Sequence, residues 1–149
     1  DGLKSWWKDG PKQKETVHEF INYSENLIES GIAWARENSF DPQIILWGFS
    51  QGAAAALVYP LFGSHPIFKA GTICGFLPEL PDSQSTSPGT CEFMGVFGVN
   101  DDVVPSFLAE FALDEIKNKG YPVQSKETQQ AHEVTAENLH DLSEFFNRP

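Results

Sequence analysis

The stretch "IILWGFSQGAAAAL" (residues 44–57) restricts the fold more than any other part of the sequence. The compact apolar run over residues 43–49 is typical of a strand that is buried on both faces of a sheet. Gly48 and Gly52 then flank Ser50, and the alanines that follow favour a helix packed closely on that sheet. A buried strand that turns sharply into a helix is the unit from which parallel sheets are built. The sequence therefore predicts an α/β fold around this turn.

The remainder of the chain alternates between helical and strand patterns. We expect helices over residues 14–38, 51–61, 106–119 and 135–146, and strands over residues 43–49, 70–74, 93–98 and 123–127. Gly31 is expected to divide the first helix into a long and a short part. This alternation predicts a mainly parallel sheet flanked by helices, with functional groups at the carboxyl ends of the strands. The 149 residues suit a single domain, 1–149, with one hydrophobic core.

Charge and composition exclude several classes of function. The formal net charge of −11 argues against nucleic acid or an anionic membrane as a main partner. No apolar run approaches the ~18 residues of a membrane span, and the polar start does not resemble a signal peptide, so we expect a cytoplasmic protein. Cys74 and Cys91 lack the spacing of zinc ligands and are expected to be buried free thiols. No metal or organic cofactor is expected.

Ser50 lies in a G-x-S-x-G pattern between the predicted strand and the predicted helix. This is the context of a nucleophile elbow, a very tight turn from which a serine hydroxyl projects. Side chains at Gly48 and Gly52 are expected to collide with the turn and the adjacent strand. The N–H of Gln51, at the positive end of the helix dipole, would be one oxyanion donor. The alternative is that Ser50 is a simple helix N-cap.

A serine nucleophile requires a base, and the expected chain order is serine, acid, histidine. His65 follows the serine helix too closely, whereas His140 and His18 are expected on solvated helix faces. His132 lies in a loop between the last predicted strand and the last helix, which is where the base should be.

The acid is expected in the stretch "VFGVNDDVVP", just past the third strand. Asp101 is the preferred candidate and Asp102 the fallback, although aspartate is also common in turns. A loop at the carboxyl end of a strand, between nucleophile and base, is the position that a triad requires.

These stretches resemble the phospholipase/carboxylesterase family of α/β-hydrolases, which includes acyl-protein thioesterases. "SWWKDG" is similar to the family's Ser-Trp-Phe-Asp stretch, "AGTICGFLPEL" to a strand that ends in a Leu-Pro turn, and "AHEVTAENLHDLSEFF" to its base loop and last helix. "GVNDDVVP" resembles the G-x-x-D-x-x-V-P acid loop, which favours Asp101. A related group of small fungal-type serine hydrolases shares the "GFSQGA" run, so the subfamily stays open.

The resemblance implies hydrolysis of a carboxylic ester or thioester in a small-molecule or acylated substrate. Ser50 would be the nucleophile, His132 the base and Asp101 the acid, with an acyl-enzyme intermediate. Dienelactone-type or peptide hydrolysis on the same fold is the less favoured chemistry. An acyl or alcohol pocket is expected to be lined by Trp6, Trp7, Leu77 and Val104.

The resemblance covers the C-terminal two-thirds of the usual family fold. Family members carry further strands before the "SWW" stretch, together with a His-Gly loop that donates the second oxyanion N–H. In this chain alone, the strand at 43–49 is therefore expected to have a bare edge. The chain would then be a fragment or a shortened variant, or a second copy or another chain would cover the edge. The alternative function is an inactive, hydrolase-derived module that acts through protein–protein interaction.

Overall fold

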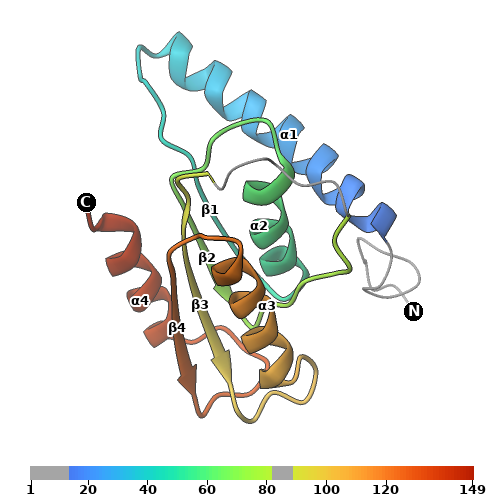
Figure 1. Cartoon of the computed structure of the whole chain (residues 1–149). Coiled ribbons are helices and arrows are strands. Elements are labelled where there is room, and N and C mark those ends of the chain that lie inside the picture. Colours follow the sequence, from blue (N-terminus) through green and yellow to red (C-terminus); the bar gives the residue numbers. More distant parts are fainter. Residues whose placement is uncertain (1–13, 82–88) are drawn as a thin grey trace, which may run out of the picture.

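Four parallel strands form one sheet with helices on both of its faces (Figure 1). The computed structural model describes residues 14–81 and 89–149. In chain order the elements are α1 (Lys14–Glu37), β1 (Ile45–Phe49), α2 (Gln51–Phe62), β2 (Lys69–Ile73), β3 (Glu92–Gly98), α3 (Ser106–Asn118), β4 (Val123–Thr128) and α4 (Ala136–Asn147). The strand order is β1-β2-β3-β4, and each neighbouring pair is parallel. The predicted α/β architecture with a parallel sheet is confirmed.

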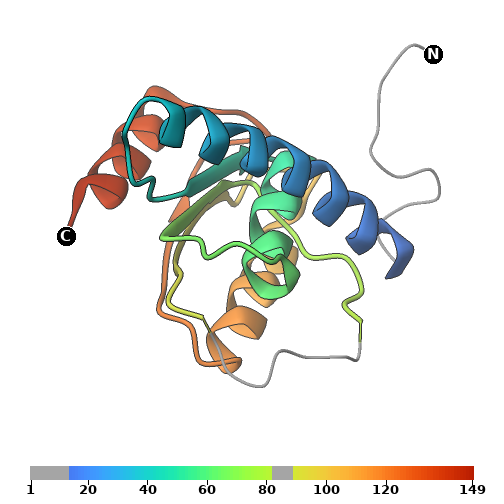
Figure 2. The same ribbon diagram turned by 90° about the horizontal axis from the view of Figure 1, so that it is seen from above.

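The helices form layers on the two sides of the sheet. Helices α2 and α3 cover one face, α4 covers the other, and α1 packs on α2 (Figures 1 and 2). Phe93, Leu113 and Ile116 belong to the core between the sheet and α2 and α3. A smaller core lies under α4 and includes Val96 and Phe145. Burial of these side chains is the main force that holds the layers together.

Helix α1 is continuous through Gly31, so the predicted break at this glycine is wrong. Ile28, Ile32 and Ala35 continue the apolar stripe past the glycine at helical spacing, and Ile28 and Ala35 are buried. Continued packing of this stripe outweighs the ~1 kcal/mol that a glycine costs inside a helix.

Strand β1 is an edge strand, and its predicted burial on both faces is wrong. Ile45 and Trp47 are 39% and 53% exposed, whereas Leu46 packs against the main core. Among the described residues, no strand pairs with the outer edge of β1. The edge position explains the exposure, because α4 contacts β2 and β3 and leaves this face of β1 only partly covered.

None of the helices described over residues 14–81 and 89–149 is both long enough and apolar enough to cross a membrane.

Candidate active site

The candidate residues gather where the parallel strands end. Ser50 directly follows β1, and Cys74 directly follows β2. Asp101 lies three residues beyond the end of β3, and His132 lies in the connection from β4 to α4. Because the strands are parallel, all four residues meet at the carboxyl edge of the sheet.

Ser50 occupies a tight elbow between β1 and α2. Its backbone has φ 58° and ψ −115°, a conformation that non-glycine residues rarely adopt. Its N–H donates to the carbonyl of Ile73 at 3.1 Å, which ties the elbow to β2. The Ser50 side chain makes no capping hydrogen bond to α2, so the simple N-cap interpretation does not describe this serine.

The two flanking glycines differ in their steric roles. A Cβ atom at Gly48 would overlap the backbone of Gly52, so the turn can close only with glycine at this position. A Cβ atom at Gly52 would meet no described atom within 4 Å, so the predicted collision at Gly52 is wrong for the described part of the chain. Only the first glycine is required by the turn itself.

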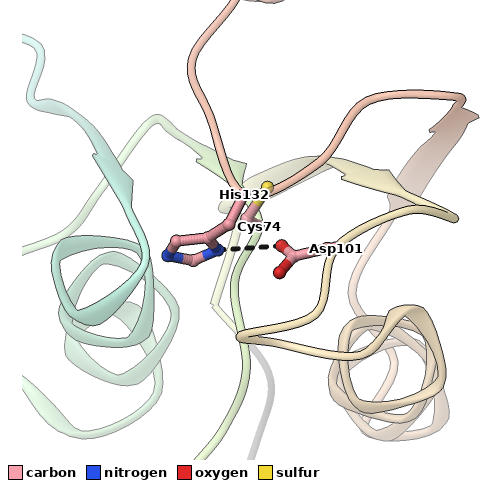
Figure 3. A group of neighbouring side chains, drawn as sticks. All are labelled: Cys74, Asp101 and His132. Carbon is pink, nitrogen blue, oxygen red and sulfur yellow. Dashed lines mark hydrogen bonds and ion pairs between the residues drawn. The ribbon is translucent and has the colours of Figure 1, made fainter.

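Three side chains form a continuous hydrogen-bonded chain. Nε2 of His132 lies 3.1 Å from Oγ of Ser50, and Nδ1 lies 2.8 Å from Oδ2 of Asp101. Figure 3 shows the imidazole and the carboxylate facing each other, joined by this second bond. An ionised carboxylate can only accept, so Nδ1–H donates to Asp101 and Nε2 is left to accept the serine proton. This tautomer is the one that a general base requires.

Asp101 is buried and its carboxylate is fully engaged. Oδ1 accepts hydrogen bonds from the N–H groups of Val103 at 2.9 Å and Val104 at 2.8 Å. Burial acts to raise the pKa of Asp101, but the bonds from His132, the two amides and Cys74 outweigh it and lower the pKa below its usual value. Asp102 is exposed, so the structure brings Asp101, not the fallback, to His132.

The loop that carries His132 is held from several sides. Gln130 Nε2 donates to the carbonyl of Glu133 at 2.7 Å and to Oδ1 of Asn138 at 2.8 Å. A Cβ atom at Gly98 would overlap the backbone of Gln130, so the end of β3 and this loop are in close contact. The ring of Phe49 packs on the imidazole with centroids 4.7 Å apart. These contacts fix the imidazole in place before any substrate binds.

Cys74 is a site residue that the sequence did not reveal. Its thiol lies beside Asp101 and His132 (Figure 3), with Sγ 3.9 Å from the carbonyl of Ala131. Burial, followed by the nearby Asp101 charge, raises the pKa of Cys74 to about 12, so the thiol is protonated and donates to the carboxylate. The only sequence signal was its position at the end of the second predicted strand. Both Cys74 and Cys91 are buried free thiols, as predicted.

Cys74, Asp101 and His132 lie close enough to share a cation. However, the carboxylate and imidazole already bond to each other, and the protonated thiol is a poor metal ligand. This cluster is therefore better suited to proton transfer than to metal binding.

The remaining predicted site residues have different surroundings. Gln51 begins α2, directly after Ser50. Val104 is buried, and its N–H donates a hydrogen bond to Oδ1 of Asp101. Leu77 packs against the main core. Trp6 and Trp7 lie outside the described residues. Pocket lining by these four apolar residues stays a prediction.

A parallel sheet with a serine elbow and an imidazole–carboxylate pair at its carboxyl edge defines an α/β-hydrolase fold. The sequence model of the Phospholipase/Carboxylesterase family matches residues 2–148. The chain belongs to this family, which confirms the resemblance found in the sequence.

Solved structures with the same fold include an esterase, an acyl-protein thioesterase and the protein SOBER1. Esterase PE8 is 21% identical, with a TM-score of 0.70, and the match covers 95% of this chain and 68% of that chain. Acyl-protein thioesterase 2 of Zea mays is 21% identical, with a TM-score of 0.68, covering 94% and 67%. SOBER1 of Arabidopsis thaliana is 19% identical, with a TM-score of 0.76, covering 96% and 69%. The chain thus spans about two thirds of the length of each neighbour. A search of curated proteins found no match.

Proposed function

We propose that the chain is a serine hydrolase that cleaves carboxylic ester or thioester bonds, and that it forms a single domain over residues 1–149. The observation that carries the proposal is the hydrogen-bonded chain from Ser50 through His132 to Asp101. Family membership supports the same class of chemistry. The named esterase and thioesterase among the structural neighbours agree with it.

The proposed reaction begins when Oγ of Ser50 attacks the carbonyl carbon of the substrate. His132 Nε2 takes the hydroxyl proton and later delivers it to the leaving alcohol or thiol, while Asp101 stabilises the imidazolium that forms. The carbonyl oxygen becomes an oxyanion, which the N–H of Gln51 and the positive end of α2 stabilise. Water, activated by the same imidazole, then hydrolyses the acyl-serine and regenerates the enzyme.

Turnover of short p-nitrophenyl esters tests this proposal. We expect the wild-type chain to release p-nitrophenol and Ser50→Ala to lose about 10³-fold or more of that rate. Ser30→Ala is the matched control, because Ser30 is exposed on α1 and its hydroxyl donates to the helix carbonyl of Asn26, far from the elbow in the chain. Equal rates for wild type and Ser50→Ala would contradict the proposal.

A protein–protein interaction module is the second candidate function, and the unpaired outer edge of β1 favours it. The exposed Trp47 lies beside a groove of about 260 Å³ that α4 lines with Leu139, Leu142 and Phe146. An exposed strand edge is a template onto which another chain can add a strand. A mass in solution that exceeds one chain, together with no ester turnover, would favour this function.

A further inference from the structure

A second cluster of titratable side chains lies near the end of the sheet where the strands begin, whereas Ser50 lies at the end where they finish. Glu25 and Glu29 are one turn apart on α1, and His65 lies in the connection from α2 to the amino end of β2. Nε2 of His65 is 3.5 Å from Oε2 of Glu25 and 3.6 Å from Oε1 of Glu29. All three atoms lie within 4.8 Å of one another.

Two of these atoms are buried without a hydrogen-bond partner. Nε2 of His65 and Oε2 of Glu25 are both inaccessible to solvent, and neither makes a hydrogen bond. Buried polar atoms in proteins nearly always have a partner, so two unpartnered atoms side by side are unusual. They face each other across 3.5 Å, and the Glu29 carboxylate lies beside them.

The spacing of the three atoms fits a shared cation better than direct hydrogen bonds. An N–H···O bond is usually about 2.9 Å long, well below the observed 3.5 and 3.6 Å. Zinc binds imidazole nitrogen and carboxylate oxygen at about 2.0–2.2 Å, so two ligand atoms of a tetrahedral site lie about 3.4 Å apart. Both distances from Nε2 of His65 to the two carboxylate oxygens, 3.5 and 3.6 Å, are close to that separation.

The surrounding residues hold the ligand atoms in this arrangement. Oε1 of Glu25 accepts from the Ser64 hydroxyl at 2.7 Å and from the Ser64 N–H at 2.8 Å, which leaves Oε2 to face His65. The N–H of His65 donates to the Tyr59 hydroxyl at 3.2 Å.

We propose that Glu25, Glu29 and His65 bind one zinc ion, or a similar divalent transition-metal ion, that joins α1 to the segment between α2 and β2. Imidazole together with carboxylates suits such ions, whereas calcium and magnesium prefer oxygen ligands alone. Two carboxylates balance the charge of the ion, and water completes the fourth position. No sequence motif indicates this site, because His65 is remote in the chain from the helical Glu pair.

Calorimetric titration of the metal-free chain with zinc sulfate tests the proposal. We expect one saturable site in the wild type and a loss of affinity of about 10-fold or more in both Glu29→Gln and His65→Ala. The Glu29 side chain is 61% exposed, so its substitution should not disturb folding. The matched control is His140→Ala, which removes a histidine that pairs with one carboxylate, Glu144 at 3.3 Å on α4. This variant should keep the wild-type affinity.

A variant at Ser64 and a spectroscopic measurement distinguish this site from zinc binding elsewhere on the chain. Ser64→Ala keeps all three ligands and the backbone N–H bond but removes the hydroxyl bond to Oε1 of Glu25, so it should weaken zinc binding by about 10-fold. Cobalt(II) bound at this site should give no thiolate charge-transfer band, whereas cobalt bound at Cys74 would give one. Absence of saturable zinc binding in the wild type would overturn the proposal. Binding that survives both His65→Ala and Glu29→Gln, or that shows the thiolate band, would also overturn it.

Discussion

Oγ of Ser50 and Nε2 of His132 lie 3.1 Å apart, although 82 residues separate them in the chain. The contact exists because the strands are parallel and the connection from β4 to α4 passes the ends of β3 and β2 to reach the elbow that follows β1 at the other edge of the sheet. The proposed chemistry depends on this register, since an imidazole can take a proton only within hydrogen-bonding distance.

Asp101→Asn should reduce kcat for ester hydrolysis by about 10⁴-fold. An amide in place of the carboxylate favours the imidazole tautomer with the proton on Nε2, which cannot accept the serine proton. Steady-state kinetics on p-nitrophenyl esters measure the effect. Asp102→Asn is the matched control, since Asp102 is exposed and adjacent, and a similar loss in both variants would contradict the assignment.

The pKa of Asp101 also predicts how stability depends on pH. Its folded-state pKa is lowered, so its ionised form stabilises the fold above the unfolded pKa of about 3.9, and this contribution is lost as pH falls through the folded value. The difference in free energy of unfolding between wild type and Asp101→Asn should therefore shrink as pH falls below about 4. Urea denaturation across this pH range measures the difference. A constant or growing difference would show that the carboxylate is not stabilised in the folded state.

The two glycines of the elbow should respond in opposite directions to alanine substitution. Gly48→Ala should destabilise the protein by about 1–3 kcal/mol, because its Cβ would overlap the backbone of Gly52. Gly52→Ala adds a Cβ to open space inside α2 and should stabilise the protein by about 0.5–1 kcal/mol. Chemical denaturation of both variants measures these changes. Equal destabilisation by the two substitutions would contradict the steric account of the turn.

The elbow also shows how far the sequence alone could lead. The motif around Ser50, the acid loop and the base loop each have local patterns, so sequence order was enough to propose Ser50, Asp101 and His132. The burial of a side chain depends on which segments pack against it, and the sequence does not show these neighbours. For this reason the exposure of the Trp47 side chain was not predicted.

Contacts between distant segments account for the other differences. The unbroken α1 depends on packing against α2, which outweighs the local preference of Gly31. The thiol of Cys74 and the Glu25–Glu29–His65 cluster form only when segments remote in sequence meet. The spacing of residues in the sequence therefore predicts neither the position of the Cys74 thiol nor the Glu25–Glu29–His65 cluster.

The two cysteines should be unreactive in the folded protein. Burial raises the pKa of Cys74 to about 12, and burial together with the adjacent Glu92 raises the pKa of Cys91 to about 12. Because the thiolate is the reacting species, a thiol reagent such as DTNB near neutral pH should label neither cysteine. Both should react after unfolding in guanidinium chloride, which serves as the control. Rapid labelling of Cys74 in the folded chain would show that it is an ionised, accessible thiol.

Labelling with a fluorophosphonate probe tests most directly whether Ser50 is a nucleophile activated by His132. Peptide mass spectrometry of the folded chain should find one phosphonylated residue, Ser50, and His132→Ala should greatly slow its formation. A folded wild-type chain that remains unlabelled at Ser50, or that labels equally fast without the imidazole, would contradict the account.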